Sequence, residues 1–179
     1  MRRLIPLIVL ALTACCNTRP VNESLLPEKP APGPLFGSIP QFDIVSKANN
    51  VYRGGQPTQA GLRYLHDVLH VDKVIKLNTD AEGSDAAAEM MGMTVIKFPI
   101  PFRQQMFGGV DKARLIRIIE QNEKNCFIHC ERGQDRTGLA VYFYETRVLH
   151  QSKKDATIDM LSHGFHKVLH GLWECVEED

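Results

Sequence analysis

The segment from Cys126 to Leu149 constrains the fold most strongly, because a short apolar run passes through a glycine-containing turn into a long apolar stretch. Cys126–His129 (CFIH) has the length and composition of a buried strand, and Thr137–Leu149 has those of a helix. Gly133 lies between the two runs, and Gly138 lies at the start of the second run. Both glycines permit a tight turn there. A strand that passes directly into a helix predicts an α/β fold.

The rest of the chain continues this alternation of strands and helices. Strands are predicted at Asn50–Arg53, Lys73–Leu77 and Thr94–Ile100, helices at Thr58–Leu69, 86–91, Val110–Asn122, Ser152–Ser162 and His166–Val176, and a loop at Pro101–Gly109. This order predicts a central, mostly parallel sheet of about four to five strands flanked by helices on both faces. Ligands of such folds bind at the carboxyl ends of the strands, which is where residues 129–138 are expected to lie.

The first 15 residues show the pattern of an export signal. A basic start, Met1-Arg2-Arg3, precedes the apolar run Leu4–Leu12, which is shorter than the roughly 20 residues that a membrane-spanning helix needs. The run ends in Leu-Thr-Ala-Cys15, which resembles the lipobox of bacterial lipoproteins. This resemblance implies lipid attachment at Cys15 and export to the bacterial periplasm or outer membrane, with the lipid as membrane anchor. The alternative is an uncleaved or simply secreted N-terminus in which Cys15 has no role.

Residues 16–40 contain six of the ten prolines of the chain. Proline removes backbone donors and fixes φ, so this segment predicts an extended tether rather than a helix or a sheet. The folded domain is therefore expected at residues 41–179, which is long enough for one hydrophobic core. Within these residues, 17 basic and 19 acidic side chains give a net charge of −2, which argues against a nucleic-acid-binding protein.

The decapeptide HCERGQDRTG (129–138) combines the elements of an anion-binding site with a nucleophile. Its glycines let successive backbone N–H groups point into one concavity at a helix N-terminus. Arg136 adds a planar guanidinium that can bind two phosphate oxygens at once. The same N–H dipoles favour the thiolate form of Cys130, and Thr137 is expected to donate its hydroxyl to the sulfur. This combination predicts phosphoryl transfer through a phosphocysteine intermediate.

HCERGQDRTG resembles the His-Cys-x5-Arg-Ser/Thr-Gly signature of the cysteine-dependent phosphatases, the tyrosine and dual-specificity superfamily. Residues 50–79 also resemble the first strand–helix–strand unit of its compact bacterial members. The resemblance implies that Cys130 is the nucleophile and that His129 braces the loop. It implies a phosphate cradle formed by Glu131, Arg132, Gly133, Gln134, Asp135 and Arg136. We expect neither a metal nor a cofactor.

The general acid is the point at which this chain departs from the superfamily. Most members carry an aspartate on a mobile loop after the strand that precedes the signature. The equivalent loop here, Pro101–Gly109, contains no Asp, Glu or His. Asp135 is one substitute, because CxxGxDRTG resembles variants among lipid and inositol phosphatases in which this aspartate has the role. Asp111, directly after the loop, is the other, unless it only stabilises the first turn of the following helix. A third possibility is that neither aspartate is the acid, and that Asp135 instead orients Arg136 or Arg132.

The substrate is less constrained than the chemistry. The signature also resembles that of tyrosine-phosphatase-like phytases, so the leading hypothesis is hydrolysis of inositol polyphosphates. Substrate contacts are expected from Arg53, Lys76, Arg103 and Arg132 around the mouth of the site. The alternative substrates are protein phosphotyrosine, for which Tyr52 and Phe102 are candidate aromatic walls, or phosphoinositides. The oligomeric state is not constrained by the sequence.

Two hypotheses from other classes compete with a phosphatase. His163, His166 and His170 recur at helical spacing and suggest a metal site, although paired C-x2-C elements are absent from the sequence. The second alternative is a non-catalytic phosphate-binding lipoprotein that uses the cradle for capture. The cysteine–arginine pair argues against it, because capture needs no nucleophile.

Overall fold

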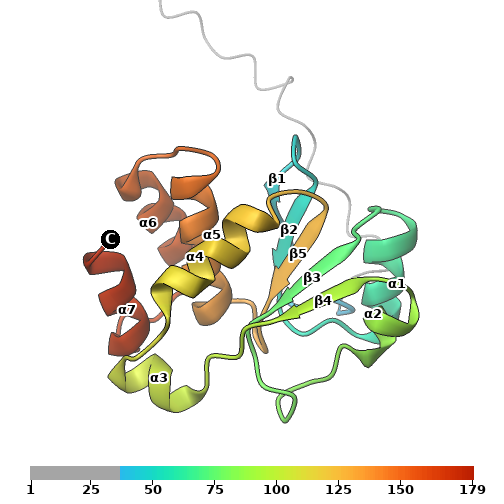
Figure 1. Cartoon of the computed structure of the whole chain (residues 1–179), viewed down its shortest axis with the longest axis horizontal. Helices are drawn as coiled ribbons and strands as arrows, with labels where there is room; N and C mark the ends of the chain where they lie inside the picture. Colours follow the sequence, from blue (N-terminus) through green and yellow to red (C-terminus); the bar gives the residue numbers. More distant parts are fainter. Residues whose placement is uncertain (1–36) are drawn as a thin grey trace, which may run out of the picture. The chain divides into compact units, whose positions relative to one another are not determined.

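The computed structural model describes residues 37–179, which form a five-stranded sheet with helices on both faces (Figure 1). The predicted signal, Cys15 and nearly all of the tether lie outside the described residues, so the predicted boundaries at residues 15 and 40 stay predictions. The strand bounds are β1 Asp43–Ser46, β2 Val51–Gly54, β3 Lys73–Lys76, β4 Thr94–Lys97 and β5 Cys126–His129. The helix bounds are α1 Gln59–Asp67, α2 Ala86–Met90, α3 Phe102–Phe107, α4 Lys112–Gln121, α5 Asp135–Arg147, α6 Lys153–Ser162 and α7 His170–Glu177.

The sheet has the strand order β1-β2-β5-β3-β4, with β5 at its centre. β5 pairs in parallel with β2 and β3, and β3 pairs in parallel with β4. Only β1 is antiparallel, as an edge strand beside β2. The predicted mostly parallel α/β fold is therefore confirmed. β1 was not predicted, because its four residues (DIVS) are largely exposed or half-buried and carry little apolar pattern.

Two hydrophobic clusters cover the two faces of the sheet. Alternate side chains of a strand point to opposite faces, so Phe127 of β5 joins a cluster with α1 and α2, whereas Cys126 and Ile128 join the cluster with α4 to α7. Figure 1 shows α1 and α2 on one side of the sheet and α4, α5, α6 and α7 on the other. α5 is buried from Arg136 to Glu145, which explains why its sequence is apolar on nearly all sides.

Two of the predicted helices begin directly after a residue whose side chain caps the first turn. Thr58 caps α1 by accepting from the Gly61 amide, and Ser152 caps α6 by accepting from the Asp155 amide. The last helix begins at His170 instead of His166, because residues 166–169 form a turn. None of the helices in the described part is long and apolar enough to cross a membrane.

The predicted loop Pro101–Gly109 is wrong in part, since it contains the short helix α3. Pro101 is the N-cap of this helix, and Gly108 ends it with a positive φ of 85°. The side chain of Gln105 faces inward and donates to the carbonyl of Ile100 at 3.1 Å. Proline and glycine thus punctuate the ends of a helical turn here, rather than filling an irregular loop.

Candidate active site

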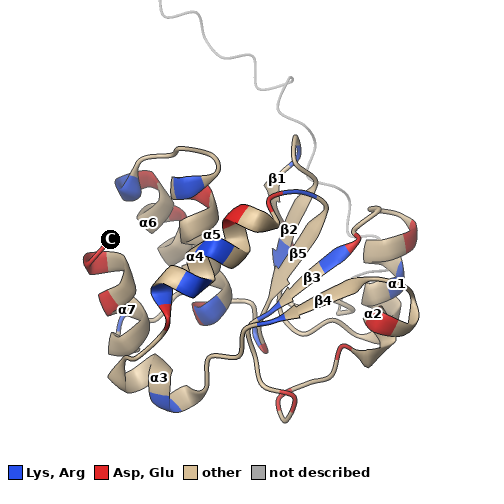
Figure 2. Cartoon of the chain, in the orientation of Figure 1, with Lys and Arg blue, Asp and Glu red and all other residues tan. Residues whose placement is uncertain are grey.

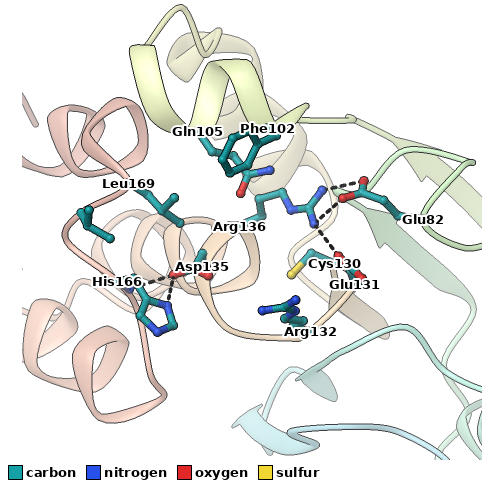
Figure 3. A pocket seen from close by; sticks show the side chains of 11 residues that line it. Glu82, Phe102, Gln105, Cys130, Glu131, Arg132, Asp135, Arg136, His166 and Leu169 are labelled. Carbon is teal, nitrogen blue, oxygen red and sulfur yellow. Dashed lines mark hydrogen bonds and ion pairs between the residues drawn. The ribbon is translucent and has the colours of Figure 1, made fainter.

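The decapeptide 129–138 forms a loop at the carboxyl end of the central strand. β5 ends at His129, Cys130 follows directly, and α5 begins at Asp135. The loop is the floor of a pocket of about 350 Å³ (Figure 3). The pocket is lined by Glu82, Phe102, Gln105, Cys130, Glu131, Arg132, Asp135, Arg136, His166, Val168 and Leu169.

Cys130 lies almost fully buried at this floor, with 2% of its surface exposed. Its Sγ accepts a hydrogen bond from the Gly133 amide at 3.3 Å. Gly133 has a φ of +81°, and a Cβ added there would lie 2.6 Å from backbone atoms of Gly54 and Gly55. Only glycine allows the loop to curl this tightly against the end of β2, which brings its amide to the sulfur. The N–H groups of the first turn of α5 add their dipoles at the same place.

Arg136 is held by a carboxylate that the sequence analysis did not identify. Its Nη1 and Nη2 donate to the two carboxylate oxygens of Glu82 at 2.8 and 2.9 Å, as the dashed lines of Figure 3 show. These bonds outweigh partial burial and lower the pKa of Glu82 to about 2. The ion pair uses the end-on edge of the guanidinium. Within residues 37–179 Nε makes no hydrogen bond, and Glu131 is the one further carboxylate near this edge, at 3.7 Å from Nη2. The edge formed by Nε and Nη2 therefore stays available to an oxyanion.

His129 braces the loop from the α1/α2 face of the sheet. Its side chain is fully buried, and its Nε2 lies 2.8 Å from Oδ2 of Asp85, whose side chain is also fully buried. Gln56 donates to the other oxygen of Asp85 at 2.7 Å. Burial alone would raise the pKa of Asp85, but the hydrogen bond and charge of His129 bring it below its ordinary value. The other ring nitrogen, Nδ1, lies 3.3 Å from the Cys130 carbonyl.

The two predicted candidates for the general acid lie in different surroundings. Asp135 lines the pocket, and its Oδ1 accepts from the His166 amide at 2.8 Å and lies 3.0 Å from the His166 ring. Asp111 is the N-cap of α4, where it accepts from the Arg114 amide at 2.9 Å, and it does not line the pocket. Only Asp135 is therefore placed near the sulfur and the arginine.

The expected ring of basic residues at the mouth is corrected by the structure. Arg53 and Lys76 are each only 1% exposed, because they are the third and fourth residues of strands whose faces are covered by helices. Arg53 donates to the Gly133 carbonyl beneath the loop, and Lys76 bonds to Asp80 and the Gly83 carbonyl. Arg103 is exposed on α3 but does not line the pocket. Of the four predicted residues, Arg132 alone reaches it.

Two further expectations meet different outcomes. Thr137 is fully buried, and its hydroxyl donates to the Gly54 carbonyl at 3.3 Å instead of to the sulfur. Phe102 lines the pocket, whereas Tyr52 stacks on Phe42 with ring centroids 5.6 Å apart and does not line it. Gly133 and Gln134 belong to the loop but do not line the pocket either.

Glu82 and Asp85 are the main site residues that sequence reasoning missed. Both lie in the segment TDAEGSD that follows β3, a neighbour of β5 in the sheet. Carboxylates after a parallel strand adjacent to the signature strand were a usable signal, because carboxyl ends of parallel strands meet at one edge. His166 had no comparable signal, since its place depends on how α6 and α7 pack.

The cysteines and histidines of the described part are not arranged as a metal site. Residues 37–179 contain no group of three or more His, Cys, Asp or Glu side chains that could hold a metal ion. Cys126, Cys130 and Cys175 are all free. Burial raises the pKa of Cys126 to about 12, so this thiol stays protonated although it lies four residues before Cys130.

The folded unit resembles several solved structures, one of which is described as a phosphatase. TpbA of P. aeruginosa matches with a TM-score of 0.59 and 21% identity, over 77% of this chain and 89% of that chain. The catalytic core of the PP-IP phosphatase SIW14 of S. cerevisiae matches with 0.59 and 21% identity, over 78% and 86%. PTPMT1 in complex with PI(5)P matches with 0.58 and 18% identity, over 77% and 96%. At these identities the likeness establishes the fold.

The sequence itself gives the family. No curated protein sequence matches the chain. A family described as "DSP-PTPase phosphatase fused to NAD+ Kinase" matches residues 16–168, which is most of the chain and includes the whole loop from His129 to Gly138. The chain therefore belongs to this family of DSP-PTPase phosphatases, and it is a cysteine-dependent phosphatase.

Proposed function

We propose that this phosphatase hydrolyses phosphomonoesters through a phosphocysteine intermediate on Cys130. The thiolate sulfur bonds to phosphorus, the phosphorus–oxygen ester bond breaks, and the leaving oxygen takes a proton from Asp135. Water then attacks the same phosphorus, the sulfur–phosphorus bond breaks, and the carboxylate of Asp135 takes up the proton of the water. The products are the alcohol, inorganic phosphate and the regenerated thiolate.

One observation supports this mechanism above the others. The sulfur of Cys130 and the guanidinium of Arg136 line the same pocket, while Glu82 holds the arginine and leaves its Nε–Nη2 edge to the pocket. A phosphoryl group bound on that edge would lie against the loop amides with its phosphorus near the sulfur. Preorganised donors of this kind stabilise the charge that develops during phosphoryl transfer.

Asp135 is the acid in this proposal because of its place in the pocket. His166 contacts its Oδ1, whereas its Oδ2 has no hydrogen-bond partner among the described residues and is free to hold the proton that is transferred. The α3 segment, where most superfamily members carry the acid, brings Phe102 and Gln105 to the pocket, and neither side chain can donate an acidic proton.

Inositol phosphates are the substrate class that we propose. The support is the aspartate within the loop, together with two structural neighbours described as a PP-IP phosphatase and as a PI(5)P complex. The pocket holds three carboxylates, Glu82, Glu131 and Asp135, beside only two arginines. Ring hydroxyls can donate to these carboxylates, so an inositol ring with few phosphates suits the pocket better than one with six.

Phosphotyrosine is a second candidate, and one feature of the pocket favours it. Phe102, Val168 and Leu169 are the apolar side chains that line the pocket, and Phe102 is 66% exposed. The ring of an aryl phosphate would cover apolar surface on these side chains. The neighbour TpbA has also been solved as a Cys-to-Ser variant in complex with pTyr.

The test is phosphate release by the full chain from inositol hexakisphosphate, inositol bis- and trisphosphates, phosphoinositides and phosphotyrosine peptides. We expect the inositol bis- and trisphosphates to give the highest kcat/KM. A clear preference for the peptide would overturn the substrate class but not the mechanism. Cys130→Ser should abolish turnover and retain substrate binding. Substrate binding by the wild type without any turnover would instead support a non-catalytic phosphate-binding protein.

We further propose that Cys15 is lipidated and anchors the protein in the envelope of a bacterium. The support is the basic, apolar and small-residue order that ends at this cysteine. Expression with a radiolabelled fatty acid should label the wild type and the matched control Cys16→Ala, but not Cys15→Ala. Equal labelling of Cys15→Ala and the wild type would contradict the assignment.

A further inference from the structure

We propose that Arg53 is a positioning residue, which fixes the phosphate loop from beneath and stabilises the Cys130 thiolate without touching the substrate. The proposal rests on the proposed function, because it assigns Arg53 a part in the same reaction. Arg53 is a buried arginine, 1% exposed, at the end of β2 and on the α5/α6 face of the sheet.

The first observation concerns the peptide groups of Gly133. Arg53 Nη2 donates to the Gly133 carbonyl at 3.2 Å, on the side of the loop away from the pocket. The amide of the same residue donates to the Cys130 sulfur at 3.3 Å. A loop that binds an anion through its amides must turn its carbonyls outward. Arg53 supplies the partner that holds one of these carbonyls there.

The neighbours of Arg53 in the chain hold the loop in the same way. The Gln56 amide donates to the Glu131 carbonyl at 2.9 Å, so a second carbonyl of the loop is turned outward by the turn after β2. Gly54 in turn accepts the hydroxyl of Thr137 at 3.3 Å. Residues 53–56 thus contact the phosphate loop at three points, and Arg53 is the charged one.

The second observation is that the Arg53 guanidinium makes few good polar contacts apart from its bond to the loop. Nη1 lies 3.5 Å from Oδ2 of Asp159 on α6, which is an ion pair but too long for a well-formed hydrogen bond. Among the described residues, Nε and Nη1 have no hydrogen-bond partner, and neither has Oε2 of the buried Glu145 on α5. An arginine that served only to stabilise the fold would be expected to satisfy its donors, because buried charges are costly.

The third observation links this charge to the nucleophile. Burial lowers the pKa of Arg53, while Asp159, Glu145, Asp43 and the negative form of Cys130 each oppose that change. The attraction between the thiolate and the guanidinium is mutual, so Arg53 favours the thiolate as the thiolate favours the charged arginine. Little solvent screens the two groups, because both are almost fully buried.

The experiment compares Arg53→Met, Arg53→Lys and the matched control Arg63→Met in the full chain. Arg63 is exposed on α1, so its replacement makes the same change of charge away from the loop. Four quantities are measured: the alkylation rate of Cys130 by iodoacetamide at pH 6, the inhibition constant of orthovanadate, kcat and KM separately, and Tm. Alkylation is read by mass spectrometry at the peptide that contains Cys130.

We expect Arg53→Met to slow alkylation, weaken vanadate binding and lower kcat by about 10- to 100-fold each, below the loss for a donor that contacts the transition state. Arg53→Lys, which keeps the charge but not the planar fork, should give intermediate values, and Arg63→Met should match the wild type. Should Arg53→Met not fold, Arg53→Lys decides by the same readouts.

A role in fold stability alone would lower Tm while alkylation and vanadate binding stay at the wild-type level, and that result would overturn the proposal. Failure of the proposed function would give a different result from failure of the Arg53 proposal. A wild type that hydrolyses no phosphomonoester would remove the function, whereas the alkylation rates would still decide whether Arg53 acts on the cysteine.

Discussion

Two arginines lie on opposite sides of the phosphate loop, and their surroundings differ in almost every respect. Arg136 faces the pocket, where both oxygens of Glu82 meet its end-on edge at 2.8 and 2.9 Å. Arg53 lies beneath the loop, where Asp159 approaches only to 3.5 Å and two of its nitrogens have no hydrogen-bond partner. Arg136 therefore forms a bidentate ion pair with a carboxylate, whereas the main hydrogen bond of Arg53 is to the backbone of the loop.

The carboxylates beside the two arginines show what the difference means. The paired geometry lowers the pKa of Glu82 to about 2. On the other side, burial raises the pKa of Glu145 to about 8, Asp159 adds to the rise, and Arg53 only partly offsets it. A nearby guanidinium therefore does not by itself ionise a glutamate. Alignment of the fork and access to water decide whether the charge is stabilised.

The charged residues on the surface of the domain do not form clusters like those around Arg136 and Arg53. Figure 2 shows acidic and basic residues interspersed over the helices. Exposed pairs of this kind contribute little each. The interactions that shape the site are therefore expected to be the buried ones at the ends of β2, β3 and β5.

The largest expected effect comes from the arginine on the pocket side. Arg136→Lys keeps the charge but loses the fork that holds Glu82 and an oxyanion together, so kcat/KM should fall by about 10²- to 10³-fold. Steady-state kinetics with a soluble aryl phosphate measure this change. Arg117→Lys on the exposed side of α4 is the control and should match the wild type. A loss below threefold would mean that Arg136 does not bind the transferring group.

The next prediction tests whether Asp135, on the pocket side of the loop, donates the proton to the leaving group. Asp135→Asn should lower kcat by about 100-fold for alkyl phosphates, the lower range of general acid catalysis. It should lower kcat far less for aryl phosphates, whose leaving oxygen needs less help. The matched control is Asp111→Asn at the N-cap of α4, which keeps a capping side chain. Equal, small losses for both leaving groups would exclude Asp135 as the acid.

A smaller effect is expected from the carboxylate that holds Arg136. Glu82→Gln keeps the shape of the side chain but removes the charge of the pair, so the guanidinium should be less fixed and kcat/KM should fall roughly tenfold, equivalent to about 1.4 kcal/mol. The exposed Glu89→Gln on α2 controls for loss of an acidic residue. An increase in activity would show instead that Glu82 competes with the substrate for the arginine.

The last effect leaves activity unchanged and concerns stability on the Arg53 side. Glu145 has a raised pKa in the fold, so an unfolded chain loses this proton first as pH rises, and the free energy of unfolding falls between about pH 4.5 and about pH 8. The Glu145 contribution amounts to at most about 5 kcal/mol, since the pKa rises from 4.5 to about 8 and each pKa unit is worth about 1.4 kcal/mol. Urea unfolding at pH 5 and pH 8 measures the loss.

In Glu145→Gln that contribution is absent, so the variant should lose less stability than the wild type between the two pH values. The comparison cancels the other titrating groups, which the two proteins share. The same pH dependence in both proteins would contradict a protonated Glu145 at neutral pH.

The sequence was sufficient for local features that repeat in every α/β protein. The strand before Cys130, the helix after it and the helices that start at Thr58 and Ser152 depend on nearby residues, and they were predicted. β1 and α3 were not, because an exposed edge strand and a six-residue helix carry too few apolar positions for a periodic pattern.

The site was predictable only where its residues are close together in the sequence. Cys130, Asp135 and Arg136 come from one loop, so their proximity follows from the motif. The partners Glu82 and Asp85 are more than 40 residues away and meet the loop only through the strand order of the sheet. Arg53 and Lys76 were misplaced because the sequence shows their charge but not which strand faces the helices cover.

Direct trapping of the phosphorylated enzyme is the sharpest test of the central claim. The full chain is mixed with a soluble aryl phosphate, and the reaction is quenched within the first turnovers. The protein is then digested, and the mass of the peptide that contains Cys130 is measured by mass spectrometry. We predict one added phosphoryl group on that cysteine, absent in Cys130→Ser, on Cys126 and on Cys175. Turnover of the substrate with no phosphoryl group on the Cys130 sulfur at any quench time would contradict the mechanism.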